Sequence, residues 1–274
     1  MDIKAFKMDG LGNDFVIIDQ RNQNYNLSKD QIIKICDRNF IGCDQLIFIQ
    51  KSDRKDAELE FYNSDGSVSG ACGNGTRCVA DLLSKENNNN KIILWTSSGT
   101  LKSKILGDNL VETEIGIPKT NWNEIPLNKD LNTENLNIKI VNKNNIEHIG
   151  GTAVNVGNPH IVFFVDNIED YDLKKIGPEV ENHEYFPEKC NVTLAKVVSK
   201  KLIRVKVWER GAGLTKACGT AACATAVAAN INGLTDKKTD IEFALGKLSI
   251  SIDENNSIHM KGPVSDIKNI EINI

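Results

Sequence analysis

Four short segments of this chain recur in the same order at a nearly constant spacing. The Gly-Asn pair of GLGNDFVIIDQ (10–20) recurs in NVGNPHIVFFVDN (155–167), 145 positions later. The cysteine of SGACGNGTRCVA recurs in LTKACGTAACATA 146 positions later, and SSGTLKSKI and VETEIGIP recur as ALGKLSISI and SIHMKGP. A period of this length indicates two copies of one domain, because solenoid repeats are much shorter.

Each copy is rich in short runs of branched and aromatic residues that end at Gly, Asn or Asp, the pattern of β-strands. The first copy offers FVIID, QLIFIQ, LEFYN, KIILWTS and NLVETEIG. Helices are fewer: one is expected over 27–40, with Ser28 as its cap, and one after each repeated cysteine. We therefore predict an α+β protein of two pseudo-symmetric lobes, residues 1–118 and 150–274, with the polar segment 119–149 as the linker.

Composition excludes several classes of function. The net charge of -4 offers no basic surface for nucleic acid. The chain has no apolar run of the length of a membrane span and no signal-peptide core at its start, so we expect a cytoplasmic protein. Seven cysteines in such a chain are expected to be reduced thiols.

Two of these cysteines, Cys72 and Cys218, stand at equivalent places in the repeat, each in Ala-Cys-Gly directly before a helix. The free N–H groups and the dipole at a helix N-terminus can lower a thiol pKa and can also hold a carboxylate. If the lobes faced each other, one thiol would remove a proton from a carbon and the other would return one on the opposite face. That chemistry inverts the carbon without a cofactor.

The other five cysteines are expected to be packing residues: Cys36, Cys43, Cys78, Cys190 and Cys223. A zinc site is not favoured, because Cys72 and Cys78, like Cys218 and Cys223, are spaced more widely than the usual close pair of a structural site. No metal site and no cofactor are expected.

The motifs GLGNDFVIID, YNSDGS, CGNGTRC, VGNPH, CNVT and WERGAGLTKACGT closely resemble those of the diaminopimelate epimerase family, in the family's order. The resemblance implies two lobes, each a strand-rich barrel around a central helix, with the active site in the cleft. It implies interconversion of LL- and meso-diaminopimelate, a step toward lysine and peptidoglycan, by a homodimer. Ala71 departs from the bulkier residue that many members carry before the first cysteine.

By that resemblance, Cys72 removes the proton from the LL isomer and Cys218 donates one, with His160 and Glu209 assisting. Arg210 is expected to pair with the distal carboxylate and Glu209 to meet the ammonium. The remaining substrate-binding residues that the family implies are Asn13, Gln45, Asn63, Gly73, Asn74, Asn158, Asn191, Gly219 and Thr220.

Four alternatives stand beside this interpretation. Proline-type racemases carry a Pro-Cys-Gly loop that ERGAGLTKACGT does not match, and an isomerase with a carboxylate base would lack the paired cysteines. A histidine-specific relative would keep both thiols and much of the site. A redox sensor would instead join Cys72 and Cys218 in a disulfide.

Overall fold

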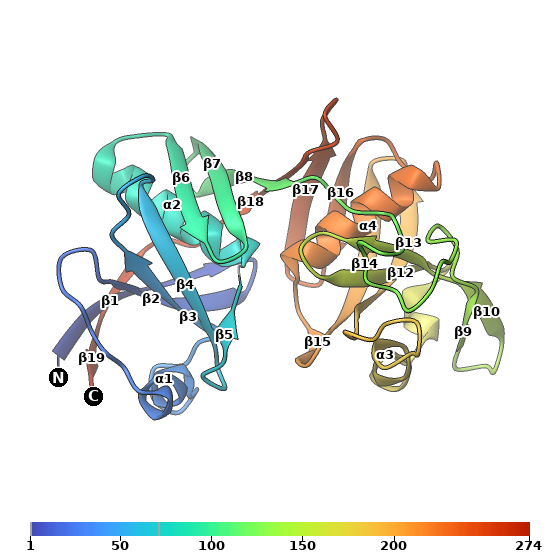
Figure 1. Ribbon diagram of the computed structural model, residues 1–274, viewed down its shortest axis with the longest axis horizontal. Coiled ribbons are helices and arrows are strands. Elements are labelled where there is room, and N and C mark those ends of the chain that lie inside the picture. The colour runs from blue at the N-terminus through green and yellow to red at the C-terminus, as the bar shows by residue number, and fades with distance from the viewer. Residues whose placement is uncertain (1, 71) are drawn as a thin grey trace. The chain divides into compact units, whose positions relative to one another are not determined.

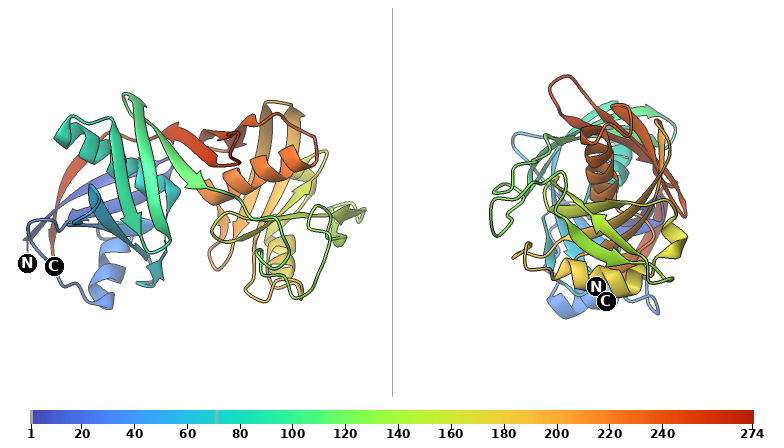
Figure 2. Two further views of the ribbon diagram at one scale, coloured as in Figure 1. Left: turned by 45° about the horizontal axis from the view of Figure 1, so that its top comes forward. Right: turned by 90° about the vertical axis from the view of Figure 1, so that its right-hand side faces the viewer.

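The computed structural model describes residues 2–70 and 72–274, so Ala71 lies outside the described residues. The chain forms two compact units (Figures 1 and 2). The first takes in residues up to Glu114 together with Lys261–Ile274, and the second is Ile115–Met260. These bounds differ from the expected lobes at both ends of the second copy.

The first unit is built mainly from antiparallel hairpins, with parallel pairs between β2 and β3 and between β4 and β6. The last strand of the chain, β19, pairs with the first, β1, over six residue pairs. Its elements are β1 (Asp2–Gly10), β2 (Asn13–Asp19), α1 (Lys29–Cys36), β3 (Gln45–Gln50), β4 (Ala57–Asn63), β5 (Val68–Ser69), α2 (Gly73–Asn87), β6 (Lys91–Thr96), β7 (Gly99–Gly107), β8 (Leu110–Gly116) and β19 (Lys268–Asn273).

Helix α2 lies among the strands of this unit (Figure 1). Its residues Cys78, Val79, Ala80 and Leu83 are buried against apolar side chains of β2, β3, β4 and β6. Because the strands surround it, polar residues of the helix such as Asp81 are buried as well. This is the expected central helix of the first lobe.

The second unit repeats that order of elements and adds a hairpin, β9–β10. Its parallel pairs are β12 with β13 and β14 with β16, the counterparts of β2–β3 and β4–β6. Its elements are β9 (Ile138–Val141), β10 (Glu147–Gly150), β11 (Thr152–Asn155), β12 (Pro159–Phe164), η1 (Ile168–Asp170), α3 (Leu173–Glu181), β13 (Asn191–Ser199), β14 (Leu202–Glu209), β15 (Gly213–Thr215), α4 (Gly219–Ile231), β16 (Lys238–Phe243), β17 (Gly246–Ile252) and β18 (Ile258–Pro263), the last of which ends in the first unit.

Helix α4 is the central helix of the second unit. Ten of its thirteen residues are buried, and six of the thirteen are alanine. A helix that is apolar on nearly every face requires cover on every face, which strands supply here. The two-lobed α+β fold predicted from the repeat is therefore confirmed.

The segment 119–149 does more than connect the copies. Ile125, Leu127, Leu136, Ile138 and Ile140 are buried in the core of the second unit beside Phe163 and Leu194. These buried apolar residues alternate with exposed positions. The exposed positions are the polar and Asn-rich ones, and they give the segment the composition of a linker.

Helix α1 begins where the sequence predicts. Ser28 accepts a hydrogen bond from the Gln31 N–H, and the Gln31 side chain accepts one from Ser28, which is a complete capping box. The helix ends at Cys36 and does not reach residue 40 as expected. The chain turns there because the cap residue, Asp37, is extended.

Candidate active site

Cys72 is the residue from which α2 starts. Its backbone is extended, with φ -140° and ψ 114°, and its carbonyl accepts hydrogen bonds from the N–H and the hydroxyl of Thr76. Gly73 and Asn74 form the first turn, whose N–H groups have no acceptor within the helix. The thiol is partly exposed.

Cys218 occupies the same position in the second unit. It precedes α4 with φ -140° and ψ 117°, and its carbonyl accepts the N–H of Ala222. Gly219 and Thr220 are the first residues of that helix. The two thiols therefore have the same backbone geometry at the start of equivalent central helices.

The protonation of Cys218 differs from the sequence expectation. Burial, followed by the charge of Glu209, raises the pKa of this thiol well above its usual value. The Thr220 hydroxyl and the Ala221 N–H oppose that shift but do not reverse it. The expected lowering of the pKa by the helix N-terminus is wrong for Cys218, because a buried thiolate loses more hydration than the helix end returns. At neutral pH Cys218 is a thiol.

Asn13 connects the first hairpin to Cys72. Its side-chain oxygen lies 3.6 Å from the Cys72 sulfur and 3.3 Å from the amide nitrogen of Asn74. Asn74 is buried and also accepts a hydrogen bond from Arg77. The structure thus brings together three of the expected site residues, Asn13, Cys72 and Asn74.

Gln45 and Asn63 form a second polar pair of the first unit. They are opposite each other on β3 and β4, and the Gln45 amide donates to the Asn63 oxygen at 2.9 Å. In the second unit Asn191 and Glu209 stand at the ends of β13 and β14, each 146 positions after its counterpart. The strand register thus shows that these residues are equivalent positions of the repeat. The sequence does not show this, because their side chains differ.

His160 is fully buried between Asn158 and Asn191. Its Nε2 lies 2.9 Å from the Asn158 oxygen, so Nε2 carries the proton, and 3.5 Å from the Asn191 amide. Burial, reinforced by the positive charge of Arg210, lowers the His160 pKa to about 3. Nδ1 has no hydrogen-bond partner among the described residues. His160 is therefore neutral at physiological pH.

Arg210 is joined to the polar group of Asn158, His160 and Asn191 through its backbone. Its N–H donates to the Asn191 oxygen at 2.9 Å, and its guanidinium donates to the Glu188 carbonyl. The side chain is otherwise exposed, so most of its donors face solvent. Such a fork can take a carboxylate with two parallel hydrogen bonds.

Two further acidic residues near this group, Glu181 and Asp44, are not predicted by the sequence pattern. Glu181, buried at the end of α3, accepts hydrogen bonds from the Trp208 indole at 2.7 Å and from the Gly211 N–H at 3.1 Å. Asp44 accepts a hydrogen bond from the Asn13 amide. Neither residue lies in a recognisable motif, and a buried acid is visible only once the fold is known.

The predicted residues thus form small groups within each unit. Cys72 lies with Asn13 and Asn74, and Gln45 lies with Asn63. In the second unit His160 groups with Asn158, Asn191 and Arg210, and the Cys218 thiol interacts with Glu209 and Thr220. Within residues 2–70 and 72–274, no three acidic, histidine or cysteine side chains are arranged to hold a metal ion.

The family model described as diaminopimelate epimerase matches residues 5–120 and 152–267. The diaminopimelate epimerase of Pelagibacter ubique (strain HTCC1062) is 76% identical over 274 residues, which is 100% of each chain. That of Caulobacter vibrioides (strain NA1000 / CB15N) is 43% identical over 94% of this chain and 93% of its own.

Solved structures share the fold at low identity. A phenazine biosynthesis protein of the PhzF family from Bacillus anthracis has a TM-score of 0.70 at 15% identity and covers 100% of both chains. A hydroxyproline epimerase from Agrobacterium vitis has a TM-score of 0.66 at 11% identity, covering 99% of this chain and 92% of its own.

Proposed function

This chain belongs to the diaminopimelate epimerase family, an isomerase family that interconverts LL- and meso-diaminopimelate, and we propose that Cys72 and Cys218 are its two acid–base groups. The observation that supports this assignment is the equivalence of the two thiols. Each begins a central helix with the same extended backbone and lies beside N–H groups that the helix does not use. The reaction belongs to lysine biosynthesis.

The reaction inverts one carbon without oxidation. In the LL direction the Cys72 thiolate takes the α-proton, and the electron pair of the broken C–H bond stays on the carbon. Cys218 then gives its proton to the opposite face, so one thiolate and one thiol exchange places. The raised pKa of Cys218, caused by burial and by Glu209, supports its starting as the thiol.

Negative charge develops on the reacting carboxylate as the α-proton leaves. We assign its stabilisation to the backbone N–H groups of Gly73, Asn74, Gly219 and Thr220, at the positive ends of α2 and α4. A preorganised donor of this kind strengthens as charge forms, so it lowers the barrier as well as binding the substrate.

The distal end of the substrate carries a carboxylate and an ammonium. The exposed fork of Arg210 suits the carboxylate, and Glu209 suits the ammonium. Asn13, Gln45, Asn63, Asn158 and Asn191 supply amide donors and acceptors. His160 is buried and neutral, so its contribution is an uncharged Nδ1 acceptor and the orientation of Asn158.

The protein is further inferred to act as a cytoplasmic homodimer without a cofactor. No disulfide joins any of the seven cysteines, all of which lie within the described residues, as is usual in a reducing compartment. No helix in residues 2–70 and 72–274 has the length and hydropathy needed to cross a membrane. Light scattering during size-exclusion chromatography tests the dimer, with a single-chain mass contradicting it.

The test of the site compares the wild type with Cys72→Ala and Cys218→Ala under reducing conditions. LL-diaminopimelate in deuterium oxide is followed for stereochemical conversion and for deuterium uptake. Conversion by the wild type and a loss of about a hundredfold or more in each variant are expected, the usual contribution of an acid–base group. A variant that converts at the wild-type rate overturns the assignment of its thiol.

Two alternatives are tested in the same assay. Turnover of histidine in place of diaminopimelate would identify a histidine-specific relative. Full turnover by the reduced protein alone excludes a redox sensor as the primary role, since a sensor needs no substrate chemistry in that state.

A further inference from the structure

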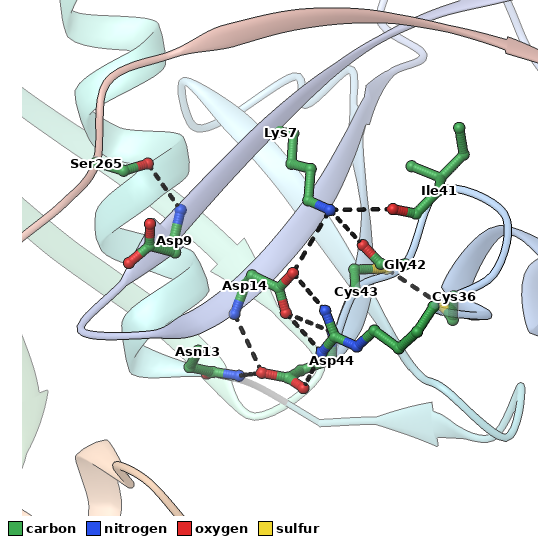
Figure 3. A network of polar contacts seen from close by, with 11 residues as sticks. Lys7, Asp9, Asn13, Asp14, Cys36, Ile41, Gly42, Cys43, Asp44 and Ser265 are labelled. Carbon is green, nitrogen blue, oxygen red and sulfur yellow. Dashed lines mark hydrogen bonds and ion pairs between the residues drawn. The ribbon is translucent and has the colours of Figure 1, made fainter. Parts of the chain in front are cut away.

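A cluster of charged side chains lies beside Asn13 and comes from β1, β2 and the loop between α1 and β3 (Figure 3). Arg38 donates to both carboxylate oxygens of Asp14 at 2.6 and 2.8 Å and to Asp44 at 2.5 Å. Lys7 lies 3.6 Å from Asp14 and donates to the carbonyls of Ile41 and Gly42. The cluster thus ties both carboxylates to one arginine.

Asp44 reaches from this cluster to the side chain of Asn13. One Asp44 oxygen accepts the Asn13 side-chain amide and the Asp14 N–H, each at 3.1 Å, while the other meets Arg38. A carboxylate bound to an arginine accepts hydrogen bonds and does not donate them. The nitrogen of the Asn13 amide must therefore face Asp44.

This orientation fixes what Asn13 presents on its other side. The amide oxygen faces the Cys72 sulfur at 3.6 Å and accepts from Asn74 at 3.3 Å. A carbonyl oxygen can accept the S–H of a thiol but repels a thiolate, whereas an amide N–H would stabilise the thiolate. The choice between them depends on which way the Asn13 amide points.

We propose that Asp44 is a positioning residue that locks the Asn13 amide with its oxygen toward Cys72, and so restrains the thiolate form of Cys72. Arg38 holds Asp44 in place from the far side of the cluster. The inference deepens the role proposed for Cys72, since a base that loses its proton too readily at rest cannot return it in the meso direction.

The test is the alkylation rate of Cys72 by iodoacetamide at fixed pH, followed by mass spectrometry of the Cys72 peptide. Asp44→Asn frees the Asn13 amide to turn its N–H toward the Cys72 sulfur, which stabilises the thiolate. Because the thiolate is the species that reacts, the alkylation rate should rise about threefold or more. Cys218, buried in the same molecules, is the internal standard and should keep its rate.

Asp37→Asn is the matched control. Asp37 lies on the same loop and accepts hydrogen bonds from Asn39, and among the described residues the hydrogen bond of the Asn13 side-chain amide goes to Asp44 and not to Asp37. Asp37→Asn loses the same charge as Asp44→Asn but leaves the hydrogen bond between Asn13 and Asp44 in place. Its rate of Cys72 alkylation should therefore remain within about twofold of the wild type. An equal rise in both variants overturns the proposal, because a general charge effect would then explain it.

A double-mutant cycle separates positioning from loss of structure. In an Asn13→Ala background the amide is absent, so adding Asp44→Asn should change the Cys72 rate by less than about twofold. A full additional effect in that background overturns the proposal, as does an unchanged Cys72 rate in folded Asp44→Asn. If Asp44→Asn does not fold, Asp44→Glu keeps the charge beside Arg38, displaces the acceptor and enters the same cycle.

None of these rates requires turnover of diaminopimelate. Failure of the alkylation cycle overturns the role of Asp44 alone, while failure of the deuterium assay overturns the role of the thiols. In the active enzyme Asp44→Asn should also lower kcat about tenfold in the meso direction, in which Cys72 returns the proton. KM should change less than about threefold, because the variant acts mainly on the protonation of Cys72 and only through one amide, Asn13, on substrate binding. A tenfold change in KM with an unaltered kcat would contradict the proposal.

Discussion

Glu181 is a buried carboxylate that holds the turn carrying Glu209 and Arg210, through Trp208 on one side and Gly211 on the other. Glu181→Leu removes the acceptor of both N–H donors. The half-buried Trp208 indole accounts for most of the loss, about 1–3 kcal/mol, because the exposed Gly211 N–H can bond to water instead. We expect a lower midpoint of urea unfolding and a lower kcat/KM for diaminopimelate.

Two companion variants separate these effects. Glu179→Leu, an exposed position on the same helix, should leave both quantities near the wild type. Glu181→Gln retains one acceptor oxygen and should recover part of the stability. A midpoint of urea unfolding equal to that of the wild type in Glu181→Leu would show that the turn does not depend on this carboxylate.

His160 makes stability depend on pH. Its folded pKa of about 3 lies below the ordinary 6.5, so the unfolded chain binds a proton first as the pH falls. Its contribution is present above pH 6.5 and is lost as the pH falls toward 3, by about 2 kcal/mol at pH 5.

Urea unfolding at pH 7.5 and pH 5, compared between the wild type and His160→Gln, measures this loss. The pKa values of His148 and His183 are lowered by burial too, and both remain in the variant, so the difference isolates His160. Equal pH dependence in the two proteins would contradict a buried neutral imidazole.

Among single residues, the sequence predicts those that stand in a motif. It misses those whose role depends on contacts between residues far apart in the chain. Cys72, Asn13 and Asn74 each lie in a repeated or family-like motif, and the structure places them together. The pKa of Cys218 was predicted wrongly, because burial is a property of the whole unit and not of the helix start. Asp44 was missed because its partner Asn13 is 31 positions away.

Among the elements, α3 packs through a glycine. A side-chain carbon added at Gly177 would lie 2.4 Å from the Trp208 ring. Gly177→Ala raises helix propensity by about 1 kcal/mol, yet this crowding is expected to outweigh it with a net loss of stability. Thermal unfolding of Gly177→Ala and of Lys174→Ala, an exposed position of α3, checks the sign. A rise in Tm for Gly177→Ala would contradict the close packing.

The same helix shows why elements differ in how well they can be predicted. Helices α2 and α4 follow an evident cysteine and run into apolar residues, whereas α3 contains Gly177 and Pro178 near its middle. Both residues normally end helices, so the sequence pattern does not predict α3. Here the packing of α3 against the strands supports a helix that local preferences disfavour.

For the whole molecule, the first unit depends on the last strand. Ile272 of β19 is fully buried beside Ile3 and Ile18, in a core that belongs to the first unit. Ile272→Ala should cost about 2–5 kcal/mol and lower hydrogen-exchange protection in β1 and β2. Amides of β13 and α4, in the other unit, should keep theirs if the units open separately.

Glu271→Ala, an exposed neighbour on the same strand, is the control and should leave protection unchanged in both units. Equal loss of protection in the two units after Ile272→Ala would show that they unfold as one.

The duplication was predictable because repeated motifs survive in the sequence, and it correctly gave two strand-rich units. The bounds of the units were not predictable in the same way. Strand β19 and segment 119–149 have no counterpart in the repeat, so their membership depends on contacts such as β1 with β19 and Ile138 with the second core.

The pairing of β1 with β19 also has a consequence for synthesis on the ribosome. Strand β1 lacks its β19 partner until that strand is made, while the second unit, which lies between them in the sequence, is complete earlier. At about 5–20 residues per second, that wait lasts roughly ten to thirty seconds after Glu114 is added. During it the edge of β1 is open to pairing with other chains, and a product interrupted before its last strand would stay in that condition.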